Sequence, residues 1–155
     1  MYLARDMELG TFWAIKQLPL FMKKEAELLR RLNHSSLPRI TDYTEQDDKC
    51  YLVMEYIKGK SLNEYLKTNN LLSFEEILTI TRTILQIFQY LHSQKPPIYY
   101  GDLKPENLMR TETGKIYLVD FGSALYSYGT VRKNIKGTKG YAAPEQYGFS
   151  QTDSR

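Results

Sequence analysis

The sequence contains a single cysteine, a single tryptophan, no long apolar run and little net charge. Cys50 alone cannot form an internal disulfide, so the chain is no disulfide scaffold, and we expect a reducing compartment, the cytoplasm. No apolar stretch approaches the roughly 18 residues that cross a bilayer, so no membrane segment is expected. The 21 lysines and arginines exceed the 18 acidic residues by only three, which gives no reason to expect a nucleic-acid partner.

The composition is otherwise that of an ordinary globular chain. Of the 155 residues, 42% are hydrophobic and 25% are charged. These fractions exclude a disordered or collagen-like chain. The length suits one domain, or two small lobes that share a cleft, and it is sufficient for a buried core.

The first third of the chain shows strand and helix patterns in alternation. An aromatic and apolar run over 12–18 predicts a strand that ends at Pro19. Apolar residues at helical spacing predict a helix over 21–33, with Phe21 and three leucines on its buried face. Further strands are expected near 1–4, 39–44 and 50–56, with a polar turn over 45–49 between the last two.

Two capping boxes mark helix starts in the middle of the chain. They are Ser61 with Glu64 and Ser73 with Glu76, and each predicts the first turn of a helix. The second helix is expected to be long, because apolar residues recur at three- and four-residue steps until a pair of prolines ends the pattern. Short strands and loops are expected beyond it. The helix stripe is interpreted as core: Ile77, Ile80, Ile84, Ile87, Phe88 and Leu91.

The second half of the chain carries the residue types that phosphoryl transfer requires. Asp102 is followed five residues later by Asn107. The aspartate can accept a hydroxyl proton, and the asparagine can ligate Mg²⁺ through its amide oxygen. Asp120 follows an apolar strand pattern over 116–119, where a poorly solvated carboxylate favours a bound cation. A polar turn over 112–115 predicts a hairpin that brings Asn107 and Asp120 to one place.

Five short motifs follow one another along the chain: Ala14-Ile15-Lys16, Glu25, DLKPEN at 102–107, DFG at 120–122 and APE at 143–145. In this order and spacing they resemble the eukaryotic-type protein kinases, and within them the serine/threonine kinases found in bacteria. The resemblance implies an α+β, two-lobed fold. A small antiparallel sheet would form the N-terminal lobe, and the C-terminal lobe would be mainly helical.

The resemblance also divides the chain. Residues 1–57 would form part of the N-terminal lobe with the hinge, and 58–155 part of the C-terminal lobe up to the APE motif. No G-x-G-x-x-G loop occurs, and Met1 falls at the position that normally closes that loop. The sequence ends ten residues after Glu145. We therefore expect a kinase domain truncated at both ends, with the missing segments supplied in trans.

The activity that the resemblance implies is transfer of the γ-phosphoryl group of ATP, with Mg²⁺, to serine or threonine hydroxyls of proteins. Asp102 would orient the substrate hydroxyl as a base, and Lys104 would neutralise charge on the transferring group. Asn107 and Asp120 would hold Mg²⁺.

The resemblance assigns the nucleotide contacts to the N-terminal lobe and the hinge. Lys16 would meet the α- and β-phosphates, with Glu25 as its counter-charge. Glu27 is the rival partner, but it lies two residues further round the helix. Ser61 falls at the position of a ribose contact, but a helix cap is the favoured explanation of this serine. The adenine pocket would be formed by the hinge over 54–57 and two flanking residues, that is by Ala14, Met54, Glu55, Ile57 and Met109.

One departure from the family pattern lies beside the catalytic aspartate. Tyr100-Gly101 replaces the usual His-Arg pair. Tyr100 can offer an aromatic surface towards Phe121, but Gly101 lacks the guanidinium that pairs with a phosphorylated activation loop. We therefore expect that phosphorylation of Thr130 or Thr138 does not activate through that contact.

Two other function classes fit parts of the pattern. The chain could be a non-catalytic, pseudokinase-like binding module or the inactive remnant of a split kinase gene. A small-molecule phosphotransferase of kinase-like fold would share Asp102, Asn107 and Asp120. The segment 137–145, which resembles the protein-substrate platform of protein kinases, argues against the phosphotransferase.

Overall fold

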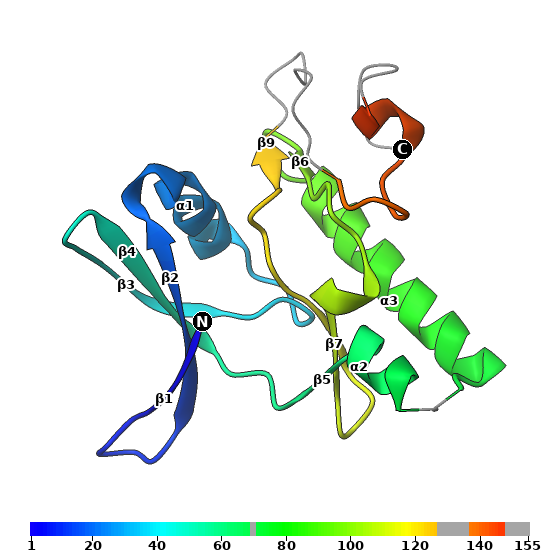
Figure 1. Cartoon of the computed structure of the whole chain (residues 1–155), viewed down its shortest axis with the longest axis horizontal. Helices are drawn as coiled ribbons and strands as arrows, with labels where there is room; N and C mark the ends of the chain where they lie inside the picture. The colour runs from blue at the N-terminus through cyan, green and yellow to red at the C-terminus, as the bar shows by residue number, and fades with distance from the viewer. Residues whose placement is uncertain (69–70, 127–136, 148–155) are drawn as a thin grey trace.

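The computed structural model describes residues 1–68, 71–126 and 137–147. Its elements form two lobes joined by the chain that leaves the sheet after Glu55 (Figure 1). This is the α+β, two-lobed arrangement that the sequence predicts. The description stops at the backbone for five residues inside helices or strands: Met22, Lys24, Glu25, Leu125 and Tyr126.

The N-terminal lobe is built on a four-stranded antiparallel sheet in the order β1-β2-β4-β3. All four strands were predicted within two residues at each end. The turn between the last two is tighter than expected, because Asp47 and Asp48 alone make it with φ angles of 49° and 57°. The strands are β1 Tyr2–Arg5, β2 Phe12–Pro19, β3 Ile40–Gln46 and β4 Lys49–Glu55.

One helix covers this sheet. It begins with a single 3-10 turn, η1 Leu20–Met22, and continues as α1 Lys23–Arg31. Its buried side packs with β4, where Leu52 and Cys50 are 0% exposed. The prediction for Phe21 is wrong: it lies in η1, before the α-helix begins, and is 84% exposed.

The C-terminal lobe is organised around two helices, α2 Leu62–Lys67 and α3 Phe74–His92. Both predicted capping boxes are confirmed, with Ser61 and Ser73 accepting the backbone N–H of Glu64 and Glu76. No helix among the described ranges is long and apolar enough to cross a bilayer.

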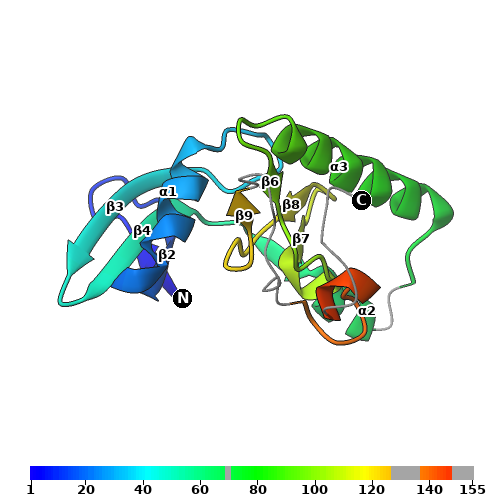
Figure 2. The same ribbon diagram turned by 90° about the horizontal axis from the view of Figure 1, so that it is seen from above.

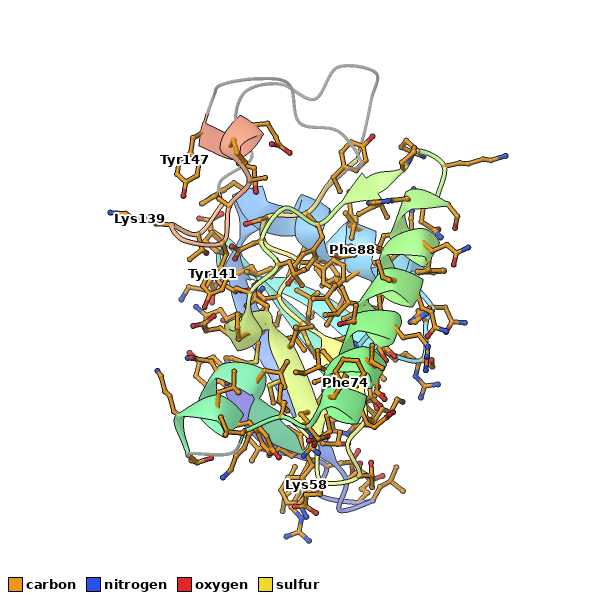
Figure 3. All side chains as sticks on the ribbon, turned by 90° about the vertical axis from the view of Figure 1, so that its right-hand side faces the viewer. Lys58, Phe74, Phe88, Lys139, Tyr141 and Tyr147 are labelled. Carbon is orange, nitrogen blue, oxygen red and sulfur yellow. The ribbon has the colours of Figure 1, made fainter. Side chains whose placement is uncertain are left out.

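The apolar stripe of α3 is only partly core. Ile80, Ile87 and Leu91 are buried, and Phe88 points inward from the helix (Figure 3). Ile77 is 47% exposed, so the prediction is wrong there. In this part of α3 the residues that lie beside the β7–β8 hairpin are Glu76, which pairs with Arg110, and Ile80, so Ile77 is turned away from the hairpin.

The remaining strands form two small sheets that carry the functional loops. One sheet has three strands in the order β5-β7-β8, namely β5 Gly59–Ser61, β7 Leu108–Thr111 and β8 Ile116–Leu118. The other has two strands, β6 Ile98–Tyr99 and β9 Leu125–Tyr126. Seen from above, the β7–β8 hairpin lies between α3 and α2 (Figure 2). Two 3-10 turns complete the lobe, η2 Pro105–Asn107 and η3 Pro144–Tyr147.

Candidate active site

The predicted hairpin brings the two halves of the site together. Between Asn107 and Asp120 the chain runs out along β7 and back along β8. The backbone N–H of Val119 donates to the carbonyl oxygen of Asn107 over 2.9 Å. Asp120 therefore lies close to the C-terminal end of η2, as expected from the hairpin turn predicted over 112–115.

Asp102 lies at the centre of a hydrogen-bonded group. Its Oδ2 is 2.7 Å from Nζ of Lys104, and its Oδ1 accepts a 2.6 Å hydrogen bond from Thr138 Oγ1. Burial by itself raises the pKa of the Asp102 carboxyl, but the hydrogen bonds from Lys104 and Thr138 outweigh it and hold the pKa below its usual value. The carboxylate is thus kept ionised, as a proton acceptor must be.

Thr138 also belongs to this hydrogen-bonded group, and the sequence contained no sign of its contacts with Asp102 and Lys104. Its hydroxyl accepts from Lys104 Nζ over 2.8 Å while it donates to Asp102. The hydroxyl considered for phosphorylation is therefore already hydrogen-bonded between Asp102 and Lys104. Thr130 lies outside the described residues.

Asp120 combines a strained backbone conformation with an ion pair to Lys16. Its φ is 61°, in the left-handed region that non-glycine residues rarely adopt, and such strain is concentrated at functional sites. Its Oδ1 lies 2.9 Å from Lys16 Nζ and accepts from the Gly122 N–H over 3.3 Å. Burial is the largest single influence and raises the pKa of Asp120, but the hydrogen bond and charge of Lys16, together with the Gly122 N–H, outweigh it and hold the pKa below its usual value.

Lys16 was expected to pair with Glu25. The Glu25 side chain lies outside the described part of the structure, so this pairing stays a prediction. The ion pair between Lys16 and Asp120 joins the N-terminal lobe to a residue 104 positions later in the chain.

The donor set fits Mg²⁺. Asn107 is 5% exposed, and its amide nitrogen donates to the Asp102 carbonyl over 2.9 Å and to Oδ2 over 3.2 Å. Within the described residues its amide oxygen has no hydrogen-bond partner and can serve as an acceptor. That oxygen and the Asp120 carboxylate are the hard oxygen ligands that Mg²⁺ prefers.

A mostly apolar cavity of about 220 Å³ lies between the lobes beside Lys16 and Asp120. It is lined by all five residues predicted for the adenine pocket and by Lys16, whereas Ser61, the predicted ribose contact, does not line it and caps α2. Sequence reasoning missed Met1, Leu29 and Pro38, because elements distant from the hinge contribute them. The predicted members are Ala14, Lys16, Met54, Glu55, Ile57 and Met109, and the others are Met1, Leu29, Pro38, Tyr56, Val119, Asp120 and Phe121.

The aromatic contact predicted for Tyr100 is present. Its ring meets Phe121 edge to face at 5.2 Å between centroids, and its hydroxyl donates to the Val119 carbonyl. Tyr100 is 3% exposed, so it fixes the start of the loop 101–107, which carries Asp102 and Asn107, against the segment that carries Asp120. Gly101 follows with a φ of 77°, a conformation that favours glycine.

Comparison with known proteins agrees with this geometry. Residues 2–154 match a family model described as "Protein kinase domain". The chain is 36% identical over 137 residues to serine/threonine-protein kinase B of Synechocystis, covering 80% of this chain and 24% of that protein. It is 34% identical over 159 residues to serine/threonine-protein kinase PrkC of Bacillus subtilis, covering 94% and 24%. The chain thus spans about a quarter of the length of these relatives.

Proposed function

Because this chain belongs to the protein kinase family, we propose that it transfers the γ-phosphoryl group of ATP to serine or threonine hydroxyls of protein substrates. The observation that carries the proposal is the group formed by Asp102, Lys104 and Thr138. An ionised carboxylate stands there beside an ammonium at 2.7 Å, on the loop that also carries Asn107. The names of the similar proteins, all serine/threonine-protein kinases, support the same substrate class.

The proposed roles follow from the chemistry of each group. Asp102 accepts the proton of the substrate hydroxyl, and Lys104 stabilises negative charge next to it. Lys16 leaves its contact with Asp120 in part to meet phosphate oxygens, with Glu25 as the proposed counter-charge. Residues 1–57 would form part of a kinase N-terminal lobe with the hinge, and 58–155 part of the C-terminal lobe.

ATP and Mg²⁺ are the proposed cofactors, as they are generally for the protein kinase family. Asn107 and Asp120 would hold the metal, and the cavity between the lobes would hold the adenine, with Ser61 near the ribose. Bound Mg²⁺ would neutralise charge on the phosphates. The proposal includes a cytoplasmic location, since the lone Cys50 suits a reducing compartment and ATP is present there.

A thermal-shift assay tests the nucleotide site. Wild type is expected to be stabilised by millimolar Mg-ATP, as a ligand that binds the folded state must do. Asp120→Asn should lose this shift, because it removes a metal ligand. Glu112→Gln is the matched control, an exposed carboxylate on the β7–β8 turn that should keep the shift.

Phosphoryl transfer is measured separately, with radiolabelled ATP and a generic protein acceptor. Wild type should label the acceptor, and Asp102→Asn should reduce labelling at least a hundredfold. Absence of any shift with Mg-ATP would contradict the nucleotide site. Binding without transfer would instead support a pseudokinase-like binding module.

A further inference from the structure

We propose that Gln146 is a positioning residue that holds the segment 137–147 against the catalytic loop, residues 101–107, by a hydrogen bond to Gly101. This contact is called the clamp below. The inference rests on the proposed function and adds to it how the protein-substrate side of the site is held. It concerns the place where the family pattern has an arginine and this chain has glycine. The clamp is a neutral side-chain amide, so it requires no phosphate group.

The contacts of Gln146 use both ends of its amide. Its Nε2 donates to the carbonyl oxygen of Gly101 over 2.7 Å. Its Oε1 accepts from the backbone N–H of Ala143 over 2.9 Å, while its own N–H donates to the Ala143 carbonyl. The Ala143 pair is a local cap of η3, whereas the Gly101 contact reaches 45 residues back along the chain.

The clamp acts next to the catalytic carboxylate. Gly101 directly precedes Asp102, whose Oδ1 is bonded to Thr138. The segment is therefore attached to the catalytic loop at two places, through Thr138 near its start and through Gln146 near its end. Two attachments fix both the position and the direction of the segment relative to Asp102.

Close packing at Gly137 supports the clamp. A Cβ added at Gly137 would lie 2.9 Å from Gln146 Nε2 and would overlap the Cβ of Ala142. Any side chain at this position would therefore push against the nitrogen that holds Gly101. Glycine at 137 leaves the Gln146 amide the space that its contact requires.

The surface that the clamp positions is exposed. Tyr141 and Tyr147 are 54% and 53% exposed, and both point away from the lobe together with Lys139 (Figure 3). A protein substrate that approaches Asp102 from this side would meet the clamped segment. The clamp should therefore affect the KM for the protein acceptor more than the KM for ATP.

The variant Gln146→Glu tests the contact with Gly101 while it retains the cap at Ala143. A glutamate keeps an acceptor for the Ala143 N–H, as in a capping box, but it places an oxygen against the Gly101 carbonyl. We expect faster amide exchange over 137–147 and 101–104, and a KM for the protein acceptor raised about three- to tenfold. The KM for ATP and the Mg-ATP thermal shift should stay within error of wild type.

Two further variants complete the test. Gly137→Ala should have the same effects by steric displacement of the amide. Gln86→Glu, at an exposed position of α3, is the matched control and should leave exchange and both KM values unchanged. If Gln146→Glu exchanges and phosphorylates like wild type, Gln146 is only a cap of η3 and the inference is overturned.

Failure of the proposed function gives a different result. A wild-type chain that labels no acceptor would contradict both the kinase activity and the positioning role. Amide exchange in Gln146→Glu would still decide whether the clamp itself exists. An equal rise in both KM values would also count against the positioning role.

Discussion

The hydroxyl of Tyr117 donates a 3.2 Å hydrogen bond to Oε1 of Glu55, across 62 residues of sequence. It also accepts from Lys115 Nζ over 2.7 Å. Tyr117 belongs to β8 of the C-terminal lobe, and Glu55 ends β4, where the chain leaves the N-terminal sheet. This polar bridge therefore fixes the hinge against the hairpin that carries Asp120.

Tyr117→Phe should lower the melting temperature by about 2–4 °C. The variant removes the hydroxyl and leaves the Glu55 carboxylate and the Lys115 ammonium without it, which costs about 1 kcal/mol. Differential scanning calorimetry measures the change. Tyr141→Phe, at an exposed ring, is the control and should shift the midpoint by less than about 1 °C. Equal midpoints for the two variants would show that the bridge contributes nothing.

Thr138→Val should reduce phosphoryl transfer about ten- to a hundredfold. Valine has nearly the shape of threonine but cannot bond the Asp102 carboxylate or Lys104, and hydrogen bonds to charged groups are the stronger ones. The rate is measured with saturating Mg-ATP. Thr138→Ser retains the hydroxyl and should keep most of the rate. If Thr138→Val were fully active, the Thr138 hydroxyl would have no role in phosphoryl transfer.

Gly101→Arg should destabilise the chain without restoring control by phosphorylation. The φ of 77° costs a non-glycine residue about 1–2 kcal/mol, and an arginine also displaces the loop that Gln146 holds. Thermal unfolding should show the same loss for Gly101→Ala. Activity before and after phosphatase treatment should be equal in wild type and in the arginine variant. A large loss on dephosphorylation of wild type would contradict this expectation.

Stability should decrease as the pH falls through about 6.5 towards 5. Burial of the ring, aided by the charge of Lys115, lowers the pKa of His34 below its value of 6.5 in an unfolded chain. The unfolded state therefore binds the proton first, and the stabilisation from neutral His34 is present above pH 6.5 and lost below it. Its Nδ1 accepts the Ser36 N–H over 3.1 Å, a bond that protonation removes.

His34→Gln should flatten this pH dependence, because an amide oxygen can accept the same N–H without titrating. Melting temperatures between pH 5 and 8 measure the slope. His92→Gln changes the other histidine of the chain and should retain the wild-type slope. A slope that survives in His34→Gln would assign the titration to other groups.

Much of the site was predictable because its chemistry demands particular residue types at fixed spacings. Asp102, Asn107 and Asp120 could be found in this way, and the hairpin between them follows from a local turn. The capping boxes at Ser61 and Ser73 are equally local, since each involves contacts only three residues apart.

The hydrogen bonds that Thr138 and Gln146 make to distant segments were not predictable. Thr138 reaches Asp102 across 36 residues and Gln146 reaches Gly101 across 45, and neither side chain has a local pattern that reveals its partner. Periodicity gave the buried face of α3 correctly at Ile87, but it could not indicate how far the covering elements extend. Ile77 is exposed although its neighbour Glu76 contacts Arg110 of β7.

The burial of Cys50 gives the chain a built-in reporter of motion. As the only thiol in the sequence, it sits in β4 at 0% exposure, beneath the helix that covers the sheet. A thiol reagent can therefore modify it only when the N-terminal lobe opens, so the labelling rate measures that opening without an introduced probe. Nucleotide bound in the cleft should slow the labelling, and denaturant should accelerate it.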